Sequence, residues 1–78
     1  MTDNDRLDFA RVKAMVSARV AIVIAMDPVT RNIFLRHRLD GWPYPRIAQA
    51  HRISVAEVEG HIAKAIAALD IGLRRHGL

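Results

Sequence analysis

Apolar residues recur at helical spacing along most of the chain. Val12, Val16 and Val20 follow one another every four residues, and Val58 and Ile62 repeat the same step near the other end. Residues that recur at this spacing lie on one face of an α-helix. Strand signals are nearly absent, because aromatic residues make up 5% of the chain and no Asn-Gly or Asp-Gly hairpin turn occurs. The pattern predicts an all-α fold.

Turn signals divide the chain into helical segments. They fall at Asp27-Pro28, in the Gly- and Pro-containing stretch 40–45, around residues 51–54, and at Gly72 and Gly77. Asp27 and Ser54 are residue types that cap helix N-termini. We therefore expect one domain over residues 1–78, a small bundle of four helices over about residues 5–26, 28–39, 44–51 and 54–70, followed by a tail at 71–78.

The second half of the first predicted helix is apolar on nearly every face, from Val20 to Met26. Such a helix is either buried on several sides within one subunit or also contacts another subunit. A partner surface or homodimer seam would use side chains of this segment: Val16, Val20, Val23 and Ile24. The run is much shorter than the about 20 residues that span a membrane, and the acidic start of the chain is unlike a secretory signal. We therefore expect a cytoplasmic protein with no membrane partner.

A short helix, a tight turn and a longer helix are predicted between residues 44 and 69. Apolar side chains at fixed positions would join the two helices: Ile47, Ala48, Ile53, Val58 and Ile62. Ala48 must be small because the second helix crosses close to it, and Ile53 fills the turn. This is the spacing of a helix-turn-helix, whose second helix enters the major groove of DNA. A small helical bundle with a polar face is the alternative that the pattern leaves open.

The outward face of the second helix would carry the DNA contacts. It holds Ala56, Glu57, Gly60, His61 and Lys64. Arg46, Arg52 and Lys64 could neutralise phosphates around the groove. Ser54 could offer its hydroxyl or the helix N-terminus to a phosphate, and His61 could contact a base edge or a phosphate. The net charge of +4 favours an anionic partner only mildly.

No arrangement of residues indicates an enzyme. The histidines at 37, 51, 61 and 76 lack the i, i+4 spacing with a carboxylate partner that a metal site on a helix needs, and the chain has 0 Cys. No Ser-His-Asp arrangement or Gly-rich phosphate loop occurs. We predict no catalytic residues, no metal and no cofactor.

Several short motifs together resemble a known family. They are Met26-Asp27-Pro28, Ile33-Phe34-Leu35, Leu39-Asp40-Gly41, Ile47-Ala48, and Ile53-Ser54 followed by Val58-Glu59 and His61-Ile62-Ala63-Lys64-Ala65. From about Val12 to Asp70 the chain resembles region 4 of bacterial sigma factors, most closely those of the extracytoplasmic-function group. The resemblance implies a four-helix domain that reads the promoter −35 element through the helix matching residues 54–69. It also implies contact with the flap of the RNA polymerase β subunit and binding by anti-sigma proteins.

The chain departs from this family at positions that bear on DNA binding. Arg52 stands where the turn usually has Gly, and a left-handed backbone there would cost about 1 kcal/mol. Arg46 replaces a usual Glu, Glu57 stands where a small or hydroxyl residue is common, and Gly60 stands where a basic residue is common. The carboxylate of Glu57 would repel the DNA backbone. Trp42 is expected to be a hydrophobic plug over the junction between the second and third helices.

Three functions follow as hypotheses. The first is a DNA-binding transcription regulator that resembles a free-standing sigma region 4, because the region that reads the −10 element would need a much longer chain. Its partner would be double-stranded DNA in the bacterial nucleoid. The second is a protein-interaction module that binds RNA polymerase or an anti-sigma factor without reading DNA. The third, a LuxR-type helix-turn-helix regulator, fits less well because Met26-Asp27-Pro28 and the long N-terminal helix match the sigma domain better.

Overall fold

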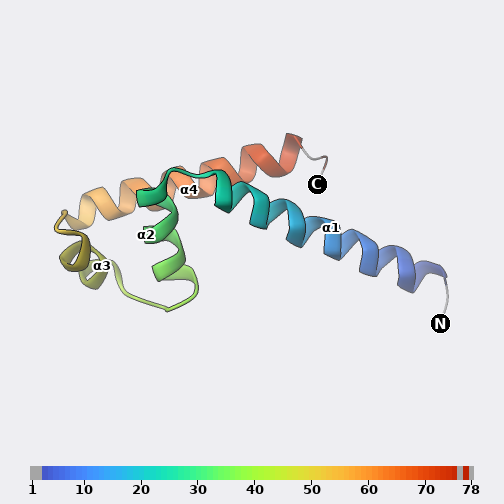
Figure 1. The fold of residues 1–78 in the computed structure, drawn as a ribbon, viewed down its shortest axis with the longest axis horizontal. Coiled ribbons are helices and arrows are strands. Elements are labelled where there is room, and N and C mark those ends of the chain that lie inside the picture. The colour runs from blue at the N-terminus through green and yellow to red at the C-terminus, as the bar shows by residue number, and fades with distance from the viewer. Residues whose placement is uncertain (1–2, 76, 78) are drawn as a thin grey trace.

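The computed structural model describes the backbone of residues 3–75 and 77, and the side chains of residues 10–75 and 77. These residues form four helices and no strand: α1 (Asp3–Ala25), α2 (Pro28–Arg38), α3 (Tyr44–His51) and α4 (Val55–Arg75) (Figure 1). The predicted all-α, four-helix fold is thus confirmed. Helix α4 contacts each of the other three helices, and α2 also contacts α3. The fold is therefore organised along α4.

Local signals fix the junction between α1 and α2. Pro28 restricts the backbone of the residue before it, so that α1 cannot run on into α2. The Asp27 side chain accepts a hydrogen bond from the backbone N–H of Thr30 at 3.1 Å, and Pro28 occupies the first turn, where its missing N–H costs nothing. Arg31 Nη1 donates to the carbonyl of Ile24 at 3.1 Å and so satisfies one of the last carbonyls of α1.

The turn between α3 and α4 is tight. Arg52 adopts a left-handed backbone with φ 56° and ψ 44°, and the backbone N–H of Ile53 donates to the carbonyl of Ala48 at 3.0 Å. Helix α4 begins two residues after Ile53, and α3 lies beside its first turns (Figure 1). The helix-turn-helix arrangement that the spacing predicts is present.

The core lies where α2, α3 and the first half of α4 meet. Its buried members are Ile33, Ile47, Ala48, Val58 and Ile62, with Phe34, Trp42, Tyr44 and Ile53 packed against them. Ile33, Ile47 and Val58 are fully buried, and burying each such side chain contributes roughly 2 kcal/mol. This small core sets the position of α4 relative to α3 and the turn.

Helix α4 is longer than predicted, because it continues to Arg75 through the segment expected to be a tail. The sequence suggested that Gly72 ends the helix, since glycine is common after helix C-termini. In the structure Gly72 instead lies against α1, and a Cβ atom on it would come within 2.6 Å of the Ile22 side chain. The missing side chain therefore allows α1 and α4 to approach closely.

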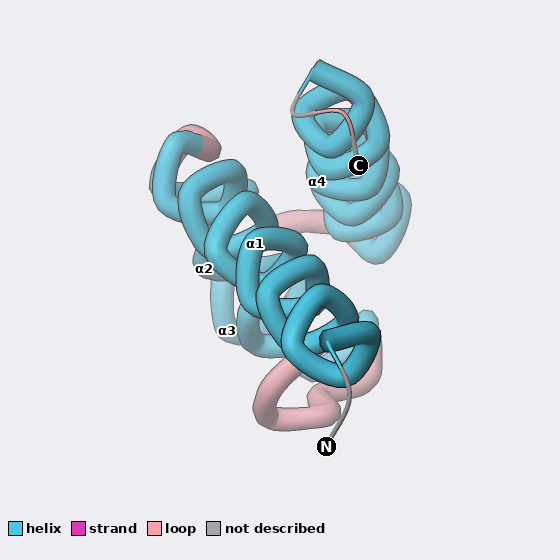
Figure 2. Tube along the Cα trace, turned by 90° about the vertical axis from the view of Figure 1, so that its right-hand side faces the viewer, coloured by secondary structure: helices cyan, strands magenta, loops and turns pink. Residues whose placement is uncertain are grey.

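The second half of α1 is not enclosed, so burial on several sides within one subunit, the first of the two alternatives for this segment, is wrong. Ala18 is buried, but Val16, Val20 and Ile24 remain exposed. The reason is that α1 packs against α4 along one side only and its N-terminal half runs beyond the other helices, giving extents of 51 × 24 × 16 Å (Figure 1). A view turned by 90° shows the C-terminal end of α4 standing apart from the N-terminal end of α1 (Figure 2). None of the described helices combines the length and apolarity needed to cross a membrane.

Candidate nucleic-acid interface

Helix α4 has one buried face and one exposed face. Val58, Ile62 and Ala65 are buried against the rest of the domain. Ala56, Gly60 and Lys64 follow one another at four-residue steps on the opposite side, and all three are exposed. A Cβ atom on Gly60 would meet nothing within 4 Å, so the glycine leaves an open notch in this outer row. The first half of α4 therefore offers a face with small side chains and accessible backbone.

Ser54 and Glu57 close a reciprocal cap at the start of α4. The Ser54 Oγ accepts a hydrogen bond from the backbone N–H of Glu57 at 3.0 Å, and the Glu57 carboxylate accepts one from the backbone N–H of Ser54 at 3.4 Å. This capping box places a carboxylate beside the positive end of the helix dipole. The Ser54 hydroxyl that we predicted to be offered to a phosphate is thus already bound within the domain.

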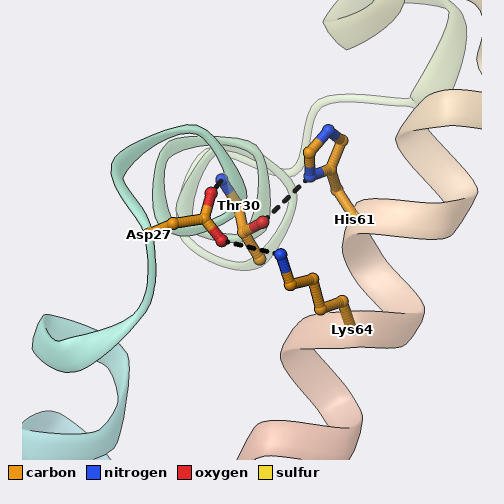
Figure 3. Close-up of polar contacts among 4 residues, drawn as sticks. All are labelled: Asp27, Thr30, His61 and Lys64. Carbon is orange, nitrogen blue, oxygen red and sulfur yellow. Dashed lines mark hydrogen bonds and ion pairs between the residues drawn. The ribbon is translucent and has the colours of Figure 1, made fainter.

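His61 is turned inward rather than outward. It is half-buried, and its Nδ1 shares a hydrogen bond of 2.9 Å with the hydroxyl of Thr30, which is 1% exposed in the first turn of α2 (Figure 3). The prediction of an outward-facing His61 is therefore wrong in part, because a buried hydroxyl needs a partner and the imidazole supplies it.

Lys64 reaches back to the same end of α2. Its Nζ lies 3.1 Å from Oδ1 of Asp27, and the lysine side chain remains 67% exposed (Figure 3). The pKa of Asp27 is lowered from 3.8 to about 2, chiefly by the backbone N–H of Thr30 and further by the Thr30 side chain and Lys64. An exposed ion pair of this kind contributes little to stability. A phosphate could therefore replace Asp27 as the partner of Lys64 at small cost.

Arg46 stacks on an aromatic ring at the start of α3. Its guanidinium carbon lies 3.9 Å from the centroid of the Trp42 ring, and that of Arg36 lies 4.7 Å from the same centroid. Arg36 is also paired with Asp40 at 2.9 Å, whereas no ion pair involves Arg46 in the described part of the chain. Trp42 packs against the core as the predicted plug, and it also orders the exposed Arg46.

Arg52 lies at the tip of the turn, exposed, in the left-handed conformation that the family's usual glycine would adopt without strain. It is the only non-glycine residue with positive φ among the described residues. Its charge therefore lies beside the N-terminus of α4, at a cost to the backbone of about 1 kcal/mol.

The structure leaves most of the predicted DNA-contacting residues exposed but changes their setting. Arg46, Arg52, Ser54, Ala56, Glu57, Gly60 and Lys64 are all exposed, and His61 is half-buried. Sequence reasoning missed Thr30 and Asp27 as partners of His61 and Lys64. It predicted Ser54 as an N-cap but missed the reciprocal hydrogen bond from the Ser54 N–H to Glu57, although the spacing Ser-x-x-Glu is a readable signal for it. No group of three or more metal-ligating side chains occurs within the described residues.

A second surface feature is an apolar groove formed by α1, α2 and α4. Its volume is about 610 Å³, and its lining includes Val20, Val23, Ile24, Leu39, Ile66, Leu69 and Leu73. Arg19 and Arg38 also line it. An exposed apolar concavity of this size marks a site for another molecule more often than a defect of packing.

A short helix, a tight turn and a capped second helix with an open outer face define a helix-turn-helix domain. Comparison with protein-family models identifies the family of this helix-turn-helix domain. The model described as "Sigma-70, region 4" matches residues 21–69. The chain belongs to this family, whose domains bind DNA and contact RNA polymerase in transcription. The resemblance predicted from the motifs is confirmed. Searches of curated proteins and of solved structures each returned no significant match.

Proposed function

We propose that this domain binds duplex DNA on its own, placing the first half of α4 in the major groove of a −35-type promoter element. The observation that carries the proposal is the exposed row Ala56, Gly60 and Lys64, which lies opposite the buried face of α4. The open notch at Gly60 lets a base edge or phosphate approach the helix backbone. The protein would then act as a transcription regulator in the cytoplasm, at the bacterial nucleoid, and not as an enzyme.

Cations around this face support the proposal. Arg46 is exposed at the first turn of α3, and Arg52 is exposed at the tip of the turn, immediately before α4. Lys64 can exchange its ion pair with Asp27 for a phosphate. Each phosphate contact releases counterions, which supplies most of the affinity of a small DNA-binding domain. Glu57 opposes binding, so we expect modest affinity for a single copy.

The experiment is fluorescence anisotropy with labelled duplex DNA of mixed promoter sequence at low and high salt. The wild type should bind more tightly at low salt, and Arg46→Ala should reduce the slope of log affinity against log salt by about one. Arg38→Ala is a matched control, because Arg38 is an exposed arginine that lines the groove and does not belong to the outer row of α4. Absence of binding at low salt with tens of micromolar protein would refute the proposal.

A second candidate function is a protein-interaction module that binds RNA polymerase or an anti-sigma factor. The specific observation in its favour is the apolar groove between α1, α2 and α4. An amphipathic helix could lay its apolar side chains in such a groove, and acidic residues beside them would meet Arg19 and Arg38. This function does not exclude DNA binding, because the groove and the outer row lie on different parts of the domain.

Purified core RNA polymerase tests this second candidate. Leu73→Lys introduces a charge into the groove and should abolish co-purification with the polymerase, while Ile71→Lys adds the same charge at an exposed position of α4 outside the groove lining. Nuclease treatment removes any bridge through DNA. Equal retention of the two variants would argue against the groove as the contact. A homodimer would assist DNA binding, since two linked domains bind a two-site target more tightly than one.

A further inference from the structure

The two ring nitrogens of His61 have different surroundings. Nδ1 lies 2.9 Å from the hydroxyl oxygen of Thr30. Nε2 has no hydrogen-bond partner among the described residues, and none of their buried side-chain nitrogens or oxygens is left without one, so Nε2 is open to solvent. Figure 3 shows this second nitrogen on the side of the ring that points away from Thr30. The domain therefore holds His61 by one nitrogen and leaves the other for a ligand.

We propose that Thr30 is a positioning residue for DNA recognition. Its hydroxyl oxygen accepts a hydrogen bond from Nδ1–H of His61 and so leaves Nε2 as an unprotonated acceptor for an exocyclic amino group at a base edge. This inference rests on the function proposed above and adds to it the chemistry that one side chain of α4 reads. In the major groove such amino groups are N6 of adenine and N4 of cytosine, whereas the phosphate oxygens offer no donor.

The position of the proton follows from the two neighbours of the Thr30 hydroxyl. A hydroxyl has one proton to donate, and its oxygen can also accept. Hydrogen bonds from Thr30, first from its backbone N–H and then from its side chain, lower the pKa of Asp27 to about 2, so the hydroxyl donates its proton to an ionised carboxylate. The oxygen is left to accept, and its donor at 2.9 Å is Nδ1–H of His61. A neutral imidazole with its proton on Nδ1 has none on Nε2.

Burial makes this arrangement hard to replace. Thr30 is 1% exposed, so water does not reach its hydroxyl. If the His61 ring turned away, the hydroxyl oxygen would lose its donor inside the domain, and buried polar groups are rarely left in that state. The orientation of the ring is therefore set by α2, although the side chain belongs to α4.

His61 lies at the edge of the exposed face of α4. It directly follows Gly60, where the missing side chain leaves open space, and it precedes Lys64 by three residues, so the His61 and Lys64 side chains are neighbours on the helix. Lys64 has donors only. This edge thus presents a donor beside an acceptor. That pair complements adenine, which carries N7 as an acceptor and N6 as a donor, better than guanine, which carries two acceptors.

NMR of the full chain without DNA tests the position of the proton. At pH 8, the upper end of the range in which imidazoles ordinarily change charge, long-range proton–nitrogen correlations show which ring nitrogen is protonated, and His61→Gln assigns the His61 signals by their loss. The wild type should carry the proton on Nδ1. Thr30→Val keeps the shape but lacks the hydroxyl and should lose this preference, whereas Thr30→Ser should keep it. A proton on Nε2 in the wild type, or an unchanged preference in Thr30→Val, overturns the inference.

Fluorescence anisotropy with duplex DNA of mixed promoter sequence, at the same pH, tests the role in recognition. Thr30→Val and His61→Ala should each weaken binding by about three- to tenfold, the range of one hydrogen bond, and Thr30→Ser should bind like the wild type. The slope of log affinity against log salt should not change, because no phosphate contact is lost. The double variant should bind no more weakly than His61→Ala, since Thr30 acts through His61. A reduced salt slope in His61→Ala, or additive losses in the double variant, overturns the inference.

Modified DNA identifies the base. Replacement of adenine by 2-aminopurine moves the amino group from the major groove to the minor groove, so it should weaken binding by the wild type but not by His61→Ala. Wild-type binding that is unaffected, together with weaker binding by His61→Ala on ordinary DNA, places the contact at N4 of cytosine. An equal loss in both proteins overturns the contact. If the wild type binds no duplex at all, the proposed function fails and the role in recognition with it, while the NMR experiment still decides the position of the proton.

Discussion

The carboxylate of Glu57 lies 3.3 Å from the hydroxyl of Ser54 at the first turn of α4. This contact stabilises the helix that we propose enters the major groove, and it also holds a negative charge where a phosphate would otherwise be attracted. The same residue therefore strengthens the fold and weakens the proposed binding. Its two effects can be separated, because glutamine can accept the same backbone hydrogen bond without the charge.

Glu57→Gln should raise the affinity for duplex DNA by about threefold or more at low salt, with a smaller gain at high salt, because a repulsive charge near the phosphates is removed. Fluorescence anisotropy measures the change. Glu59→Gln removes the same charge from a neighbouring exposed position and should have a smaller effect. If the two variants gain affinity equally, Glu57 acts only through net charge and does not lie at the interface.

Arg52→Gly should raise the free energy of unfolding by about 1 kcal/mol, because glycine adopts the left-handed backbone at the turn without strain. For a domain of this size the melting temperature should rise by about 4–8 °C. Arg52→Ala removes the same side chain but keeps the strained conformation, so it should not be stabilised. Both variants should lose affinity for DNA to the same degree. A stabilised alanine variant would show that the arginine side chain, and not the backbone, is unfavourable.

Trp42→Leu should lower the affinity for DNA by about two- to fivefold, because Arg46 loses the ring on which its guanidinium stacks at 3.9 Å. The salt dependence of binding should stay close to that of the wild type, since the charge at position 46 remains. Trp42→Tyr keeps an aromatic face and should retain most of the affinity. A reduced salt slope in Trp42→Leu, like that expected for Arg46→Ala, would mean that the arginine no longer reaches the phosphate at all.

The stability of the domain should fall as the pH drops from 3.8 towards 2, in part through Asp27. Its pKa is lowered to about 2, mainly by the backbone N–H of Thr30, so the folded state favours the ionised carboxylate. That contribution is present above pH 3.8 and is lost as the carboxylate protonates. Asp27→Asn keeps an N-cap but cannot titrate. The stability gap between wild type and variant, measured by urea denaturation, should therefore shrink as the pH falls, and a gap that stays constant would contradict this account.

The parts of the fold that the sequence predicted are those fixed by contacts between residues that are close together in the chain. Asp27 before Pro28 and Ser54 at the start of α4 act through residues three positions away, so they can be read from a short window. The position of α1 has no local cause, because its exposure depends on which helices lie beside it. Gly72 shows the same limit: it reads as a helix end, yet its role is to let Ile22 approach from a helix fifty positions earlier in the chain.

The candidate site was also predictable only in part. The 3.6-residue period correctly separated the buried Val58 and Ile62 from the exposed Ala56 and Gly60. It could not show that His61 turns towards α2. That contact joins His61 to Thr30, which is 31 positions away in the sequence, and it exists only once α2 and α4 have packed.

Helix α4 runs without interruption from Val55 to Arg75, and it carries the face proposed for DNA at one end and a wall of the apolar groove at the other. From Val55 to Leu73 the rise of an α-helix amounts to about 27 Å, with a rotation of about 100° for each residue. A molecule in the groove is therefore held at a fixed distance along the α4 axis, and at a fixed rotation about it, from DNA bound at the proposed face. Insertion of a single alanine midway along α4 would turn the groove wall by about 100° relative to the face proposed for DNA, so the two ends of the helix would no longer keep this relation.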